Sequence, residues 1–197
     1  MIHLYLMRHG ETEHNTKGVY YGWTDLRLNE NGIKQAENLA RILGHISFDT
    51  VISSPLKRAR ETAVIAGKLP EEKIVLDERL KELNFGSWEG KHYREIQKED
   101  PENWDRWVRD WKEGAPPGGE SFSSMFRRVS ESVQEMLEKY AGQTLLVVTH
   151  QGCLRIIISI LLHLGQEGYW HFTFTQGTYS LLEIENGFCI VKKINCC

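Results

Sequence analysis

Residues 144–150 read TLLVVTH, a continuous apolar and largely β-branched run that ends in two polar residues. A strand that is apolar on both faces is typical of a parallel sheet covered by helices on both sides, because neither face meets water. The next segment, 152–164, is predicted to be a helix. We therefore expect 144–150 to be a central strand of an α/β protein.

Strand and helix signals alternate along the rest of the chain. Strands are predicted at 2–7, 50–53, 74–76, 178–185 and 188–194, and helices at 29–43, 56–67 and 121–140. Asn29 is a predicted helix cap, Ile33 begins the apolar stripe of that helix, and Pro55 suits the first turn of the next helix. Asn186-Gly187 predicts a hairpin between the last two strands. This order predicts one domain across 1–197, a three-layer α/β/α sandwich with a mainly parallel sheet.

The alternation stops between about 84 and 119, a stretch rich in Trp, Glu, Gly and Pro. We interpret it as an insertion that covers the active-site end of the sheet. Trp104, Trp107 and Trp111 are spaced i, i+3 and i+7, so they are predicted to share one helix face. They either pack the insertion onto the body or form an aromatic wall against a substrate.

The composition excludes several classes of function. The 197 residues carry a formal net charge of −3, with 41% hydrophobic and 26% charged residues. No basic excess indicates nucleic acid, and no basic tract indicates a membrane surface. Arg8 and His9 interrupt the first apolar stretch too early for a signal peptide, so we expect a cytoplasmic protein. The four cysteines lack the spacing of a zinc site and are expected to be reduced thiols.

Polar side chains follow three of the predicted strands. Ligands of parallel α/β sheets bind at the carboxyl ends of the strands, so these side chains are expected to converge. Guanidinium groups match phosphate oxygens, and helix N-termini add favourable amides. The sequence therefore predicts an anion site, most simply for phosphate, built from Arg8, His9, Ser53, Ser54, Arg58, Thr149 and His150.

The chain has no Walker A loop, dinucleotide fingerprint or G-x-S-x-G elbow, and no obvious metal spacing. Phosphate chemistry at this site would then need a side chain as nucleophile, and a neutral imidazole is suited to it. A nearby carboxyl group must protonate the leaving oxygen and later activate water. Glu82 and Glu89, on either side of the FGSW segment at 85–88, are the two candidates.

Five segments in order resemble the histidine phosphatase superfamily, also called the phosphoglycerate mutase-like family. They are LMRHGETEHN (6–15), GWTDLRLNENG (22–32), ISSPLKRARETA (52–63), KELNFGSWEG (81–90) and VVTHQG (147–152). The resemblance implies a phosphatase that needs no cofactor or metal. It places His9 as the nucleophile, Glu82 as the proton donor, and Arg8, Arg58 and His150 around the phosphoryl group. The candidates for further contact with substrate are Asn15, Gly22, Gln151 and Trp107.

Within the superfamily, the second half of the chain resembles the alpha-ribazole phosphatases of cobalamin synthesis. The resemblance rests on Gln151 and on the segments 99–122 and 168–184. It implies a small phosphate ester as substrate, alpha-ribazole 5′-phosphate or the corresponding cobalamin phosphate. The alternatives are a broad-specificity sugar phosphatase, a phosphoglycerate mutase, a phosphoprotein phosphatase and a non-catalytic phosphate-binding domain. The sequence leaves the oligomeric state open, a homodimer included.

Overall fold

A computed structural model describes all 197 residues and shows one six-stranded sheet in the order β3-β2-β4-β1-β5-β6. The four strands β3, β2, β4 and β1 are parallel, and β5 pairs antiparallel with both β1 and β6. The mainly parallel sheet is thus confirmed. The strands are β1 (Ile2–Arg8), β2 (Thr50–Ser53), β3 (Val75–Leu76), β4 (Thr144–Thr149), β5 (Tyr179–Glu185) and β6 (Phe188–Cys196).

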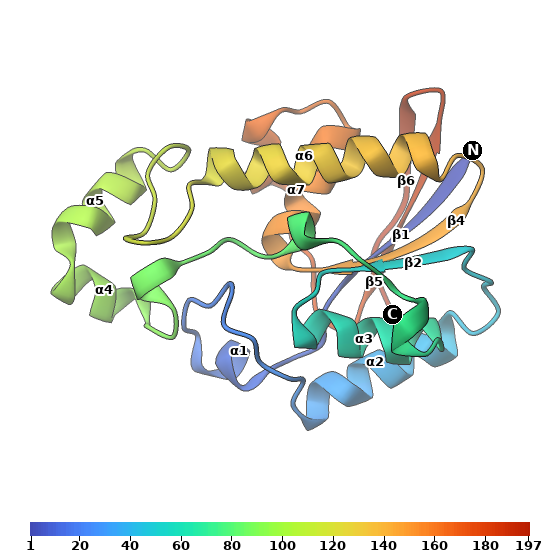
Figure 1. The fold of residues 1–197 in the computed structure, drawn as a ribbon, viewed down its shortest axis with the longest axis horizontal. Coiled ribbons are helices and arrows are strands. Elements are labelled where there is room, and N and C mark those ends of the chain that lie inside the picture. Colours follow the sequence, from blue (N-terminus) through green and yellow to red (C-terminus); the bar gives the residue numbers. More distant parts are fainter.

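Helices cover both faces of this sheet, which makes the three layers of the predicted sandwich (Figure 1). One face packs against α2 (Glu30–Ile42) and α3 (Lys57–Gly67), and the other against α6 (Phe122–Lys139) and α7 (Gln151–Leu161). No helix is both long enough and apolar enough to cross a bilayer.

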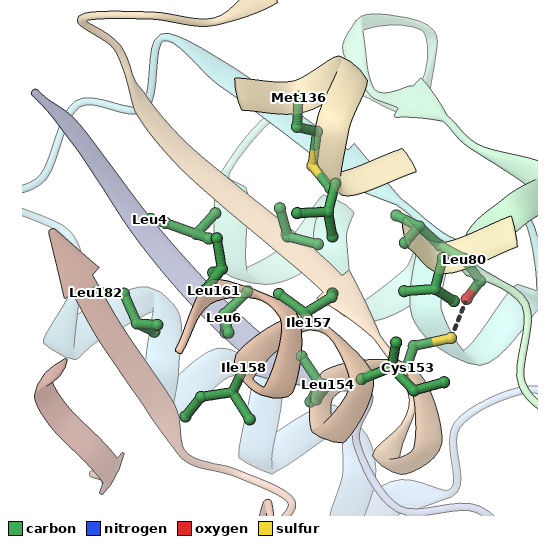
Figure 2. Close-up of a cluster of buried hydrophobic side chains, with 14 of the residues drawn as sticks. Leu4, Leu6, Leu80, Met136, Cys153, Leu154, Ile157, Ile158, Leu161 and Leu182 are labelled. Atoms are coloured by element: carbon green, nitrogen blue, oxygen red, sulfur yellow. Dashed lines mark hydrogen bonds between the residues drawn. The ribbon is translucent and has the colours of Figure 1, made fainter. Parts of the chain in front are cut away.

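The side chains of β4 show that the sheet is buried on both faces. Leu145 and Val147 pack in the cluster under α6 and α7, whereas Leu146 and Val148 pack in the cluster under α2 and α3. All four are at most 1% exposed. Figure 2 shows part of the first cluster, where Leu154 on α7 lies among other buried aliphatic side chains. Alternate side chains of one strand thereby join both helical layers to the sheet.

Helix starts follow local capping, with two departures from the prediction. Asn29 caps α2 by accepting a hydrogen bond from the Gly32 N–H at 2.8 Å. Pro55 does not lie in the first turn of α3, which begins at Lys57, and the Lys57 N–H donates to the Asp25 carboxylate at 2.7 Å. Ile33 lies outside the buried stripe of α2 and is 41% exposed.

Several short elements complete the fold. The insertion forms η3 (Gly86–Trp88), α4 (Tyr93–Glu99) and α5 (Pro101–Arg109), which lie beyond the end of the sheet where the parallel strands finish (Figure 1). The predicted hairpin forms at Asn186-Gly187, where both residues have positive φ. The remaining short helices are α1 (Glu13–Lys17), η1 (Glu71–Lys73), η2 (Glu78–Leu80) and η4 (Gln166–His171).

The loop after β1 is held against α2 by two glycines. A Cβ on Gly10 would lie 2.5 Å from the Gly32 carbonyl oxygen, and a Cβ on Gly32 would lie 2.2 Å from the Glu11 carbonyl oxygen. Backbone atoms are in the way in both cases. The close approach of loop and helix therefore requires glycine at both positions.

Gly32→Ala is expected to lower the free energy of unfolding by about 1–3 kcal/mol, because the added methyl group pushes α2 away from the loop. The exposed neighbour Asn31→Ala is the control and should stay within about 0.5 kcal/mol of the parent. Urea unfolding of the three proteins measures both values. Equal stability of Gly32→Ala and the parent would show that the contact is not constraining.

Candidate active site

His9 lies at the end of β1 and is almost fully buried. Its backbone N–H continues the ladder to β4 by donating to the Thr149 carbonyl at 2.9 Å. On the ring, Nδ1 lies 2.7 Å from the Gly10 carbonyl oxygen. A carbonyl oxygen only accepts hydrogen bonds, so Nδ1 must carry the proton. Nε2 is then the ring nitrogen with the free lone pair.

The surroundings of His9 keep the imidazole neutral. Burial lowers the pKa of His9 well below its usual value of 6.5, and the guanidinium groups of Arg58 and Arg8 lower it further. A neutral ring with Nδ1 protonated presents an unprotonated Nε2 at neutral pH. This is the form in which an imidazole is a nucleophile.

His150 faces His9 from the neighbouring strand. The residue caps α7 directly after β4, and the two ring centroids are 5.1 Å apart. His150 Nε2 lies 2.8 Å from the Ser54 hydroxyl, which itself accepts the Leu56 N–H. The hydroxyl proton can then be donated to Nε2, and in that arrangement a neutral His150 carries its own proton on Nδ1. Burial, followed by the charge of Arg58, lowers the pKa of His150 well below its usual range.

Arg8 and Arg58 bring two guanidinium groups to the same place. Arg58 is fully buried and donates to the carbonyl oxygens of Gly22 at 2.6 Å and Thr24 at 2.9 Å. Arg8 donates to the Phe174 carbonyl at 3.1 Å. The Nε atoms of both arginines are buried without a hydrogen-bond partner, and so is Nδ1 of His150. Buried donors without partners are rare in folded proteins and indicate a missing acceptor.

Glu82 reaches the site from the segment after η2. Its carboxylate accepts hydrogen bonds from the backbone N–H of Leu83 and of Gly152, both at 3.0 Å. Gly152 is the second residue of α7, so the carboxylate lies at the helix N-terminus beside His150. Burial lowers the pKa of Arg8 and of Arg58, and the nearby Tyr21, followed by Glu82 when it is ionised, opposes that effect in both.

Comparison with known proteins identifies the family of the chain. The family model of the histidine phosphatase superfamily (branch 1) matches residues 4–197. The chain belongs to this superfamily. The fold and the enzyme class predicted from the sequence, an α/β/α phosphatase, are thereby confirmed.

Three relatives of this histidine phosphatase cover nearly the whole chain. The adenosylcobalamin/alpha-ribazole phosphatase of Escherichia coli is 37% identical, and that of Salmonella typhimurium is 39% identical; each match covers 98% of this chain and 96% of the relative. The crystal structure of the alpha-ribazole phosphatase from Shigella flexneri superposes with a TM-score of 0.92 at 37% identity, covering 98% and 96% of the two chains.

The second acidic candidate, Glu89, has a different function in this histidine phosphatase. Its carboxylate accepts the backbone N–H groups of Gly22, Trp23 and Thr24, and also the Thr24 hydroxyl. Although burial alone would raise the pKa of Glu89, these hydrogen bonds lower it. Glu89 is therefore held as an anion that fixes the loop which receives Arg58.

Asn15 is oriented by a network that the sequence did not reveal. Its side-chain oxygen accepts from the Tyr21 hydroxyl at 2.8 Å, from Gln176 at 2.8 Å and from the N–H of Thr12 at 3.0 Å. The amide nitrogen of Asn15 is then the group left for a ligand. Tyr21 also lies under Arg58, whose guanidinium carbon is 4.8 Å from the ring centroid. No spacing or residue type marked Tyr21 in advance.

Gly22 and Gln151, two of the candidates for contact with substrate, both lie beside the arginines: the Gly22 carbonyl accepts from Arg58, and the Gln151 amide oxygen lies 3.5 Å from Arg8 Nη1. A Cβ on Gly22 would lie 1.5 Å from the Leu83 carbonyl oxygen, so glycine is required there. The Gln151 side chain accepts the Phe174 N–H at 3.1 Å and donates to Thr173 at 3.1 Å. The side chain of Gln151 therefore fastens the segment 173–174, and its backbone amide at the start of α7 remains available for a ligand.

The insertion differs from the prediction in one respect. Helix α5 ends at Arg109, so Trp111 lies beyond it and does not share a helix face with Trp104 and Trp107. Trp104 and Trp107 pack on Trp88, with ring centroids 5.9 and 5.6 Å away. Trp88 belongs to the insertion itself, and the pair meets the body at Tyr20, whose ring centroid is 6.3 Å from that of Trp104 and 5.9 Å from that of Trp107. Trp107 also lines an apolar cavity. Trp111 packs on Phe122 in a second aromatic group.

Arg128 on α6 is a further residue that the sequence did not reveal. It donates to the carbonyl oxygens of Arg79 and Lys81, both at 2.6 Å, and of Glu82 at 3.0 Å. It also pairs with the Glu120 carboxylate. One buried cation thus fixes the backbone that carries Glu82. In the sequence, Arg128 is distinguished only as one of two adjacent arginines, Arg127 and Arg128, on the predicted helix 121–140.

We expect the stability of the protein to fall between about pH 7.5 and about pH 5.5, because His9 and His150 are buried in their neutral forms. Their pKa values are lower in the folded than in the unfolded state. Their contribution to stability is therefore complete above the unfolded value of about 6.5 and decreases as the pH falls below it. The expected loss is roughly 1–2 kcal/mol per histidine about one pH unit below that value.

Urea unfolding of the parent and of a His9→Asn/His150→Asn double variant at both pH values measures this effect. The double variant should lose less stability on acidification. His45→Asn, at the surface and away from the site, is the control and should behave as the parent. Identical pH slopes for the parent and the double variant would contradict the assignment.

Proposed function

We propose that the protein is a phosphomonoesterase that acts through a phosphohistidine at His9 and uses no metal ion. The observation that carries the proposal is the set of buried donors without partners, Arg8 Nε, Arg58 Nε and His150 Nδ1, around a neutral His9. A phosphate ester supplies oxygens for all three. Its two negative charges also balance the two guanidinium groups, which form no ion pair within the chain.

The first step transfers the phosphoryl group to the enzyme. His9 Nε2 attacks phosphorus in line, so that a P–N bond forms while the bond to the leaving oxygen breaks. Glu82 gives its proton to that oxygen, and the product leaves as an alcohol. The positive charge that develops on the ring is shared with the Gly10 carbonyl through the Nδ1 proton. The guanidinium groups of Arg8 and Arg58 and Nδ1–H of His150 stabilise the equatorial oxygens.

The second step returns the enzyme to its starting state. Glu82, now a carboxylate, takes a proton from water, and the hydroxide oxygen attacks phosphorus. The P–N bond breaks, inorganic phosphate leaves, and Nε2 regains its lone pair. Glu82 ends the cycle protonated again. The contacts of its carboxylate with Leu83 and Gly152 support this assignment, because they place it at the pocket while Glu89 is occupied by the loop.

As substrate we propose alpha-ribazole 5′-phosphate. The support is the identity of 37–39% to enzymes named adenosylcobalamin/alpha-ribazole phosphatase, at almost complete coverage of both chains. A cytoplasmic location fits the four cysteines, which are all free.

Glu82→Gln is expected to lower the rate constant of phosphoenzyme formation by about 100-fold or more for an alkyl phosphate but by much less for p-nitrophenyl phosphate, whose leaving group needs no proton. Rapid-quench kinetics with both esters measures the two ratios. Glu78→Gln, which changes an exposed carboxylate of the same segment, should leave both rates unchanged. Equal losses on both esters for Glu82→Gln would argue against an acid at this position.

In a panel of alpha-ribazole 5′-phosphate, ribose 5-phosphate and 3-phosphoglycerate, the first should have the highest kcat/KM. His9→Ala gives the background rate. Mutase activity with 2,3-bisphosphoglycerate should be absent. A higher kcat/KM for 3-phosphoglycerate than for alpha-ribazole 5′-phosphate would refute the substrate assignment and leave the two-step chemistry untouched.

A further inference from the structure

An apolar cavity of about 320 Å³ lies between α5 and η4. Pockets for small organic ligands begin at about this size. Its lining contains no charged side chain and no amide, and five of its seven residues are aromatic. The lining residues are Leu83, Trp107, Val108, Trp111, Phe122, Tyr169 and Trp170.

Two elements connect this cavity to the phosphate site. Leu83 lines the cavity and directly follows Glu82, whose carboxylate accepts the Leu83 N–H. On α7, Arg155 lies three residues after Gly152, about 4.5 Å further along the axis. The Arg155 guanidinium carbon lies 5.2 Å from the ring centroid of Tyr169 and 5.8 Å from that of Trp170. The cavity therefore begins at the residue next to the acid that protonates the leaving group.

The aromatic rings that line the cavity pack against one another. Phe122 lies between Trp111 and Tyr169, with ring centroids 4.6 and 4.8 Å away. Trp170 meets Trp111 edge-on at 5.5 Å. Gly168 lets η4 approach α7, because a Cβ there would lie 2.2 Å from the Ser159 hydroxyl oxygen. The rings thus need little reordering on binding.

The cavity is also open on one side. Trp170 is 59% exposed and Val108 is 55% exposed, which leaves two large apolar side chains in contact with water. A structural core would bury them. Rings that are packed on the inside and exposed at the mouth are typical of a site for an apolar ligand.

We propose that this cavity binds the flat, uncharged aromatic base of the substrate, with the sugar bridging to the phosphate site. The inference rests on the proposed function and adds to it the part of the protein that selects the leaving group. Aromatic walls stack on a flat ring system, and the seven lining side chains themselves carry no charge to pair with a charged substituent.

The test compares Trp170→Ala with Trp170→Phe and with the control Phe188→Ala, which removes an aromatic ring that is 70% exposed on β6. Each protein is assayed with alpha-ribazole 5′-phosphate and with ribose 5-phosphate, which lacks the base. Alpha-ribazole, which lacks the phosphate, is measured as an inhibitor of ribose 5-phosphate hydrolysis. Circular dichroism confirms that the variants are folded.

Trp170→Ala should lower kcat/KM for alpha-ribazole 5′-phosphate by about tenfold and change that for ribose 5-phosphate by less than about twofold, since one stacking partner is lost. The inhibition constant of alpha-ribazole should rise by a similar factor. Trp170→Phe should restore most of both values, and Phe188→Ala should match the parent.

Equal effects of Trp170→Ala on the two substrates, or no effect on either, would overturn the inference. A failure of the proposed substrate looks different. The parent would then prefer ribose 5-phosphate, yet alpha-ribazole would still inhibit with a constant that depends on Trp170. If alpha-ribazole does not inhibit the parent at all, the cavity is not a base subsite.

Discussion

The hydrogen bond from His9 Nδ1 to the Gly10 carbonyl is the interaction on which the rest of the site depends. It decides which ring nitrogen carries the proton and therefore which one can attack. The bond is short and buried, and its acceptor belongs to the next residue, so the ring cannot turn without losing it. Gly10 is held in turn by Thr62, whose hydroxyl accepts the Gly10 N–H at 2.9 Å and donates to the Arg58 carbonyl at 2.7 Å. The nucleophile and one of its arginines are thereby joined through a single side chain.

The arrangement is costly to build, because Arg8 and Arg58 are taken out of water without a carboxylate partner. An unpaired buried charge normally destabilises a fold. The backbone offsets part of this cost by turning the carbonyl oxygens of Gly22, Thr24 and Phe174 toward the guanidinium groups. Glu89 contributes indirectly by holding the 22–24 loop in place. We propose that the remaining imbalance of charge attracts a phosphate dianion to the pocket, in which case stability and function oppose each other here.

How much the sequence could predict depends on the range of the interactions. The apolar run 144–150 and the strand–helix alternation predicted the sandwich, since burial on both faces leaves a direct trace in residue type. The positions of His9, Arg58 and His150 after predicted strands also indicated that they lie close together, because the carboxyl ends of parallel strands meet at one edge of the sheet. The choice between Glu82 and Glu89 could not come from residue type, because it depends on which backbone N–H groups each carboxylate meets. The motif resemblance favours Glu82, and our proposal follows it because the 22–24 loop engages Glu89.

Other features depend on tertiary contacts that have no local signature. Trp111 fits the helical spacing, yet α5 ends two residues before it, and the ring packs on Phe122 instead. Tyr21 and Arg128 support Asn15 and Glu82 through single side-chain contacts from distant segments. Both residues become recognisable only when the partners lie side by side in space.

The most direct test of the account is to trap the phosphoenzyme by rapid alkaline quench during turnover and to map the phosphoryl group by mass spectrometry and NMR. The account predicts phosphorus on Nε2 of His9, because Nδ1 is committed to the Gly10 carbonyl. Phosphorus on Nδ1, phosphorus on another residue, or full turnover with no phosphoenzyme would contradict it.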